Sequence, residues 1–222
     1  MGHSLKNKRI LVTCGPTWVP IDTVRVVSNI STGALGQRIA LDCAKAGARV
    51  TLLEGPVNCS LKSPSIKTVK FHYYHEFFAL FKKELRKNYH AVIHAAAVSD
   101  YQLKKTFNVK ISSSLKSLTL TLIPTRKIIN IIKKISPKSF LIGFKLESKV
   151  NRAVAITKGR KLIDEAGCNA VVVNSLHGGK YSAYLVGQDS KILNHSKTKK
   201  ELSKEIVKLL KAPPSAGQEK SR

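Results

Sequence analysis

The stretch from Ser28 to Gln37 combines two amides, three hydroxyl groups and two glycines ahead of an apolar pattern. Leu35, Ile39, Ala40 and Ala44 recur at helical spacing, so a helix is predicted to begin within the stretch. The first N–H groups of a helix lack partners within it and carry the positive end of its dipole, which favours bound phosphate. An ordinary capped helix of an α/β protein would show the same residues, so the stretch alone leaves both interpretations open.

Two further groups of residues could meet this helix start at one edge of a sheet. Residues 91–98 read as a buried strand that runs into small side chains, and small residues at a strand exit let a ligand approach the backbone. Packing of these alanines under a helix is the alternative. Together these groups could bind a nucleoside triphosphate and a second anionic substrate. For any single lysine, the alternative is that it belongs to a solvent-exposed face with no ligand. The candidates are Asp22, Arg25 and Asn29 with Gly33 and Gly36; Ala96, Ala97 and Asp100; and Lys110, Lys158, Arg160 and Lys161.

Other familiar kinds of site have no signal in the sequence. No Ser/His/Asp arrangement is recognisable, and the seven histidines have no zinc spacing, so we expect no metal held by the protein. His94 ends a buried strand and is interpreted as a hydrogen-bonded core histidine. The four cysteines form no C-x-x-C pair, which favours buried free thiols in a reducing compartment, with one disulfide left open.

A dinucleotide oxidoreductase is a separate alternative. The Rossmann fingerprint places Gly-x-Gly-x-x-Gly directly after the first strand. Here Gly15 is separated from Gly33 and Gly36 by the long segment 16–32, and Glu54 could stand in for a ribose-binding acid. The insertion places polar and charged side chains where the phosphates of a dinucleotide would approach, which argues against ordinary NAD binding.

The composition indicates a globular protein with an unusual charge. The chain has 222 residues, 43% of them apolar, and no run long enough to span a membrane, so we expect a cytoplasmic protein without a membrane partner. Its net charge of +26 raises nucleic-acid binding as an alternative, because lysine and arginine neutralise phosphates. The positive residues are spread from Lys6 to Arg222 without an aromatic–basic RNA motif, so nucleic acid is not expected as the main partner.

Strand-like and helix-like runs alternate along most of the chain, which predicts an α/β fold. We expect a Rossmann-like parallel sheet with helices on both faces, one domain over 1–211, and a disordered tail over 212–222. The predicted strands are 9–14, 48–54, 66–71, 91–98, 140–144 and 170–174, with a hairpin of 182–186 and 191–193. Besides the helix that begins in 28–37, the predicted helices are 75–87, 126–135, 151–165 and 199–211.

The middle of the chain departs from this alternation. Residues 108–112 and 118–123 read as two short strands joined by Ser-rich turn material, with no helix between them. We interpret them as part of a small β arm over about 102–124. Such an arm could bind a ligand or a second subunit, and the sequence leaves both open.

Several motifs together resemble phosphopantothenoylcysteine synthetase. Since they are spread along the chain, the resemblance covers about residues 8–210. The motifs are Thr13-Cys14-Gly15-Pro16-Thr17, Pro20 to Arg25, Ser28 to Gly36, Gly47 to Val57, Ala95 to Tyr101, Ile142-Gly143-Phe144 and Val171 to Asn174.

The resemblance implies a phosphopantothenate–cysteine ligase of coenzyme A biosynthesis that works in two steps. The carboxylate of 4'-phosphopantothenate attacks the α-phosphate of CTP and releases pyrophosphate, and the amine of cysteine then displaces CMP from the acyl-cytidylate. It also implies Mg²⁺ with the CTP, no flavin, and a homodimer with a shared site. A separate phosphopantothenoylcysteine decarboxylase is a further expected partner, since no flavin-dependent half precedes the motifs.

The resemblance assigns roles to residues by matching positions. Asn29 matches an asparagine that holds the acyl-nucleotide intermediate, Arg25 an arginine reached from the neighbouring subunit, and Lys110 the first lysine of an arm motif; these are the implied catalytic residues. The implied nucleotide-binding residues are Gly15, Ala96, Ala97, Asp100, Lys110, Phe144 and Lys161, with the backbone of Ile123, Pro124, Thr125 and Arg126. The implied phosphopantothenate-binding residues are Ser31, Thr32, Gly33 and Gly36, with Arg25.

Two of the matched motifs are incomplete. The second and third arm lysines are replaced by Ser112 and Ser113, and a family lysine four positions beyond Lys161 corresponds to Glu165. These departures bear on nucleotide affinity and on the preference for CTP over ATP. The alternative function is a non-catalytic protein on the same fold, whose basic surface binds nucleic acid or an acidic partner.

Overall fold

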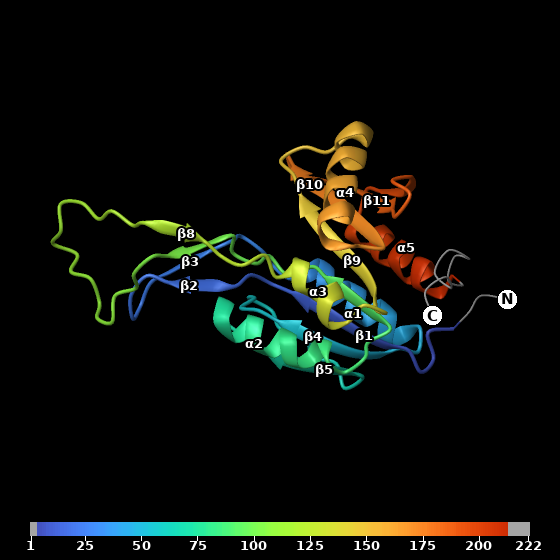
Figure 1. The fold of residues 1–222 in the computed structure, drawn as a ribbon, viewed down its shortest axis with the longest axis horizontal. Helices are drawn as coiled ribbons and strands as arrows, with labels where there is room; N and C mark the ends of the chain where they lie inside the picture. The colour runs from blue at the N-terminus through green and yellow to red at the C-terminus, as the bar shows by residue number, and fades with distance from the viewer. Residues whose placement is uncertain (1–3, 213–222) are drawn as a thin grey trace.

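The computed structural model describes residues 4–212 and arranges them around one eight-stranded sheet (Figure 1). The strand order is β12-β11-β10-β9-β6-β1-β4-β5. The six strands from β10 to β5 run parallel, and β11 and β12 add an antiparallel hairpin at one edge. The bounds are β1 (Arg9–Cys14), β4 (Arg49–Glu54), β5 (Ile66–Lys70), β6 (Ala91–His94), β9 (Phe140–Leu146), β10 (Ala170–His177), β11 (Lys180–Gly187) and β12 (Ile192–Ser196).

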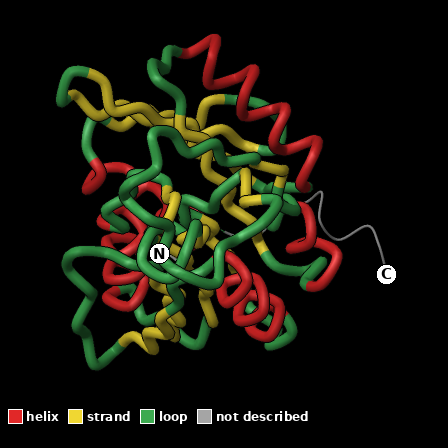
Figure 2. Tube along the Cα trace, turned by 90° about the vertical axis from the view of Figure 1, so that its left-hand side faces the viewer, coloured by secondary structure: helices red, strands yellow, loops and turns green. Residues whose placement is uncertain are grey.

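Helices cover both faces of the sheet, as the sequence predicted. One face carries α1 (Ala34–Lys45) and α5 (Lys199–Lys211) over an apolar layer that includes Ile39 and Ile206. The other face carries α2 (Tyr74–Leu85), α3 (Ile129–Ile135) and α4 (Arg152–Ala166) over a layer that includes Phe77 and Ile132. Seen from the side in Figure 2, the helices flank the strands, and loops fill the side that faces the viewer. The central strands are buried almost along their whole length because both faces are covered.

Gly36 sets how closely α1 approaches the sheet. A Cβ atom at this position would lie 2.4 Å from the Cβ of Cys14 and 3.2 Å from the carbonyl oxygen of Thr13. Only a glycine therefore lets the first turn of α1 rest directly on the end of β1.

A two-part arm projects from the edge of the sheet where the parallel strands end (Figure 1). Its first part is the hairpin of β2 (Trp18–Pro20) and β3 (Val26–Ser28), and its second is the antiparallel pair of β7 (Tyr101–Leu103) and β8 (Leu122–Pro124). The N–H of Phe107 donates to the carbonyl oxygen of Ile21 at 2.9 Å and joins the two parts.

Most predicted elements agree with the structure to within three residues at each end; the helix predicted over 126–135, for example, begins at Ile129. Four segments differ by more. The strand expected over 91–98 ends at His94, because residues 95–100 leave the sheet and bond to the segment after β1. The strand expected over 108–112 is wrong: these residues form bends and loops, and the one expected over 118–123 shortens to β8. The segment 16–32, interpreted only as an insertion, contains the β2–β3 hairpin.

Three of the cysteines are buried free thiols, as predicted, whereas Cys59 is exposed. The tail expected over 212–222 lies outside the described residues apart from Ala212. Within residues 4–212, no helix combines the length and the apolar character that crossing a membrane requires.

Candidate functional site

Three segments meet at the point where β1 and β6 end. The N–H of Ala97 donates to the carbonyl oxygen of Gly15 at 2.9 Å, which ties residues 95–100 to the segment after β1. Asn29 joins them from the segment before α1: its Nδ2 donates to the carbonyl oxygens of Ala97 at 3.3 Å and Val98 at 3.1 Å. Because both Nδ2 hydrogens are used, the side-chain oxygen of the exposed Asn29 is the atom left for a ligand.

His94 and Thr13 fix the first part of segment 95–100. The Oγ1 of Thr13 accepts a hydrogen bond from the N–H of Ala96 at 3.2 Å and lies 2.9 Å from Nδ1 of His94. The ring of His94 stacks on Phe77 and Phe81, with centroid distances of 6.0 and 5.2 Å. Burial lowers the pKa of His94 to about 4, so the ring is neutral at pH 7. His94 is therefore the core histidine that the sequence predicted.

Two more buried threonines hold the rest of the segment. Thr17 Oγ1 accepts from the N–H of Ser99 at 2.9 Å, and the Thr125 hydroxyl donates to the Ser99 carbonyl oxygen at 2.7 Å. The N–H of Thr125 donates to the carbonyl oxygen of Asp100 at 2.9 Å. The loop 123–126 therefore lies beside Asp100, and Lys127 Nζ reaches the Asp100 carboxylate at 2.5 Å.

The start of α1 presents free backbone N–H groups. Its N-cap is Gly33, in the left-handed conformation with φ of 70°, and no side chain caps the helix. The hydroxyls of Ser31 and Thr32 each accept from the N–H two residues further on, at 3.4 Å. No hydrogen bond within residues 4–212 occupies the N–H of Leu35 or Gly36. These groups and the helix dipole make the α1 start suitable for an anionic ligand.

Arg25 lies in the arm rather than beside Asn29 of the same chain. Its Nη1 lies 2.5 Å from the Asp22 carboxylate and donates to the carbonyl oxygen of Ile111 at 3.1 Å. Burial would raise the pKa of Asp22, but hydrogen bonds from the N–H groups of Ile111, Val24 and Arg25 and from the guanidinium hold it well below its usual range. Asp22 thus links the β2–β3 hairpin to the long loop of the second part of the arm.

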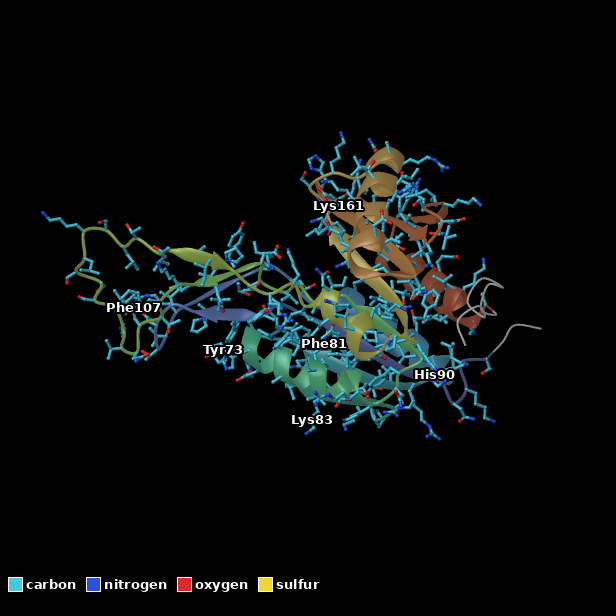
Figure 3. All side chains as sticks on the ribbon, viewed as in Figure 1. Tyr73, Phe81, Lys83, His90, Phe107 and Lys161 are labelled. Atoms are coloured by element: carbon cyan, nitrogen blue, oxygen red, sulfur yellow. The ribbon has the colours of Figure 1, made fainter. Side chains whose placement is uncertain are left out.

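The other predicted site residues are not gathered around Asn29 within one chain. Lys110 is exposed on the arm, and Lys161 is exposed on α4 with its Nζ 3.8 Å from the Glu165 carboxylate. Figure 3 shows Phe107 on the arm and Lys161 on α4 in separate parts of the molecule. Phe144 is half-buried on β9, two strands from β1. Among the described residues, no hydrogen bond or ion pair joins either lysine to Asn29 or Asp100.

Sequence reasoning assigned no role to Lys127, Thr13 or Thr17, because their contacts join segments that are far apart along the chain. The only local signal is that Thr13 and Thr17 flank a glycine at a strand end.

Glu54, which the sequence offered as a possible ribose-binding acid, is fully buried in the structure. Its Oε1 accepts hydrogen bonds from Gln37 Nε2 at 2.8 Å and from the N–H of Leu61 at 3.1 Å. Glu54 is therefore not exposed to a ribose. The oxidoreductase alternative depended on this residue for ribose binding and is left without that support.

The candidate carboxylates, one on the arm and one beside Lys127, do not form a metal-binding group. Asp22 and Asp100 are each paired with a cation, Arg25 and Lys127. Within residues 4–212, no cluster of three or more histidine, cysteine, aspartate or glutamate side chains is suited to hold a metal ion. A metal at this site would need ligands from a bound molecule.

Comparisons with known proteins agree on one family. The family described as "DNA/pantothenate metabolism flavoprotein C-terminal domain" matches residues 5–212. The coenzyme A biosynthesis bifunctional protein CoaBC of Thermococcus kodakarensis is 37% identical over 215 residues, which cover 93% of this chain and 53% of that protein. This chain therefore spans about half the length of that relative.

Solved structures extend the similarity to the fold. The DNA/pantothenate metabolism flavoprotein from Streptococcus pneumoniae superposes with a TM-score of 0.82 at 25% identity, covering 91% of this chain and 98% of that one. The C-terminal domain of a coenzyme A biosynthesis bifunctional protein CoaBC gives a TM-score of 0.78 at 27% identity, covering 94% of this chain and 96% of that one. The α/β architecture is therefore shared along nearly the whole chain.

Proposed function

Because this chain belongs to the DNA/pantothenate metabolism flavoprotein C-terminal domain family, we propose that it is a phosphopantothenate–cysteine ligase driven by CTP. The observation that carries the proposal is the clamp of Asn29 on the backbone of Ala97 and Val98. The clamp lies in the chain segment that leads into α1, where no hydrogen bond within residues 4–212 occupies the N–H groups of Leu35 and Gly36. A neutral amide oxygen and anion-binding donors therefore belong to one segment.

The first proposed step activates the substrate acid. A carboxylate oxygen of 4'-phosphopantothenate attacks the α-phosphorus of CTP, the bond from that phosphorus to the bridging oxygen breaks, and pyrophosphate leaves with the electron pair. The free N–H groups at the start of α1 stabilise phosphate negative charge during this step. The carboxylate thereby becomes an acyl phosphate, which is a far better acyl donor.

The second proposed step forms the amide. The amine nitrogen of cysteine attacks the acyl carbon, the bond from that carbon to the phosphate oxygen breaks, and CMP leaves while the nitrogen releases a proton. The Asn29 amide nitrogen is already committed to two carbonyl oxygens. We therefore assign the side-chain oxygen of Asn29 to accept a hydrogen bond from the incoming amine or from the intermediate, instead of donating to an oxyanion.

Mg²⁺ belongs to the proposed reaction as part of the CTP complex. Since the described residues offer no group of metal-binding side chains, triphosphate oxygens would supply its ligands. Lys127 places a cation beside Asp100, and this lysine is not part of the arm motif. It is a candidate to offset the loss of lysines at Ser112 and Ser113.

A homodimer with a shared site is the proposed assembly. Lys110 and Arg25 lie on the arm, and among the described residues neither is hydrogen-bonded to Asn29 of the same chain. The arm also exposes an unusual number of large apolar side chains, which indicates a protein interface. The most exposed of these are Val24, Val109, Leu115 and Tyr101. A second copy that covers this arm would bring the arm's cations to the partner's α1 start.

The test is turnover with CTP, 4'-phosphopantothenate and cysteine, followed as CMP and pyrophosphate release. We expect kcat/KM to fall by about 10²-fold in Asn29→Ala, since a positioned polar group at a reacting centre contributes that order of magnitude. Asn130→Ala, at an exposed position on α3, is the matched control and should retain activity. Absence of CMP or AMP release by the wild type with either CTP or ATP would overturn the proposal.

A further inference from the structure

The proposed ligase leaves most of the positive charge of the chain without a role. The sequence contains 39 lysines and arginines against 13 aspartates and glutamates. Such an excess repels itself in the folded state, so a dense cation group far from the site calls for a specific explanation. One such group lies where α1 and α5 end side by side.

A groove between these two helices is lined mainly by lysines. Its cavity volume is about 430 Å³, and its apolar lining residues are Ala46 and Val207. We call it the lysine groove and define it by its lining residues, which are Asp42, Lys45, Ala46, Lys204, Val207, Lys208 and Lys211. Lys45 and Lys204 are exposed and belong to no ion pair between the described residues.

The single acid in the groove is already neutralised. Asp42 Oδ2 accepts from Arg38 Nε at 2.8 Å and from the Ser203 hydroxyl at 2.7 Å. Lys208 lies 3.8 Å from Glu205, a loose pair whose lysine is 79% exposed. A surface pair of this kind contributes little and leaves the lysine available. The groove therefore presents net positive charge to whatever approaches it.

We propose that the lysine groove binds the phosphate backbone of double-stranded nucleic acid without reading its sequence. From Lys204 to Lys211 the α5 cations extend over about 10 Å at the helical rise, a length over which a duplex presents several phosphates. The lining contains no aromatic side chain on which an unpaired base could stack, which favours a duplex backbone over a single strand.

A lipid surface is a poorer match for the same face. Membrane-surface helices place large apolar side chains next to their cations. The large exposed apolar residues of the described chain lie on the arm and in other segments, and none of them is on α1 or α5. The lysine groove thus offers charge for phosphates but no side chains to insert between lipids.

The groove is remote from the candidate site, so the two activities are separable. The α1 helix starts at the candidate site and ends at Lys45 beside the lysine groove. In Figures 1 and 3, the end of α5 and His90 lie at the end of the molecule opposite the arm. The inference therefore holds whether or not the chain is a ligase.

The experiment measures binding of the full chain to a random-sequence 20-base-pair DNA duplex over a series of salt concentrations. Lys204→Gln/Lys208→Gln removes two groove cations, and Lys82→Gln/Lys83→Gln removes two from α2 as a matched control. We expect the groove variant to lower the slope of log K against log salt by about two, since each phosphate contact contributes about one. The control should leave the slope unchanged.

Three results would overturn the inference. An equal decrease of the salt-dependence slope in both double variants would show that the net charge acts diffusely and that the groove is not a site. No binding of the wild type at 150 mM salt would do the same. Tighter binding to poly-glutamate or to vesicles with phosphatidylserine than to the duplex, lost in the groove variant, would assign the groove to another partner. Circular dichroism of each variant checks that the fold is retained.

Discussion

Gly36→Ala should both destabilise the protein and displace the start of α1. The new Cβ would lie 2.4 Å from the Cβ of Cys14, a contact that no rotamer change relieves because both atoms are fixed to the backbone. Replacing a helical glycine by alanine gains up to about 1 kcal/mol in helix propensity. Overpacking of this kind costs about 1–3 kcal/mol. We expect a net loss of up to about 2 kcal/mol in the free energy of unfolding.

The same substitution should reduce ligase activity by more than the loss of stability explains. Relief of the clash requires α1 to move away from β1 by about 1 Å, and a displacement of that size near reacting groups can cost about 10²-fold in rate. Gly159→Ala is the matched control, since the three atoms nearest to its Cβ would be those of the Val186 side chain at 3.0–3.1 Å, a milder overlap than the 2.4 Å at Gly36. Urea unfolding gives the free energies, and CMP release under conditions where both variants are folded gives the rates.

A single result would refute this reasoning. If Gly36→Ala unfolds at the same urea concentration as the wild type and turns over at the same rate, the close contact between α1 and β1 does not set the geometry of the helix start. If Gly36→Ala lost stability but kept full activity, the packing argument would still hold, but the contact between α1 and β1 would have no effect on the site. In that case the α1 N–H groups would not be the anion donors we propose.

Two further perturbations test other parts of the structure. Since burial lowers the pKa of His94 to about 4 from 6.5, the stability that its neutral ring provides is complete above pH 6.5 and is lost as the pH falls toward 4. Urea unfolding at pH 8 and pH 5 should differ by about 2 kcal/mol more in the wild type than in His94→Phe, and equal differences would contradict a neutral buried ring. Val109→Asp on the arm should shift the protein from dimer to monomer in sedimentation, whereas Leu193→Asp, an exposed apolar position on β12, should not. An unchanged dimer in the arm variant would contradict the proposed interface.

The sheet and its helices could be predicted because their signals are local. β1 and β10 are built on the short apolar runs 10–12 and 170–173, and α5 repeats its apolar residues at helical spacing, so each follows from neighbouring residues alone. The arm is different, since its conformation depends on contacts across the chain. The N–H of Ile111 donates to the Asp22 carboxylate 89 residues away, so the alternating pattern around Ile111 does not form the predicted strand.

The candidate site shows the same division. The helix start and the small residues after β6 could be proposed from their types and spacing. The ion pair of Lys127 with Asp100 could not, because the two residues are 27 positions apart and meet only when Thr125 docks on Ser99. The orientation of the Asn29 amide was also beyond the sequence, since it depends on two carbonyl oxygens of a segment that leaves the sheet.

An arm that extends away from its own Asn29 has a genetic consequence. If each centre takes its cations from one subunit and its amide from the other, an Asn29→Ala chain and a Lys110→Ala chain are each inactive as pure homodimers. A mixed dimer of the two would hold one centre with both lesions and one centre with neither. Co-expression of the two defective alleles would then restore up to a quarter of the wild-type turnover, a level set by random pairing of the chains.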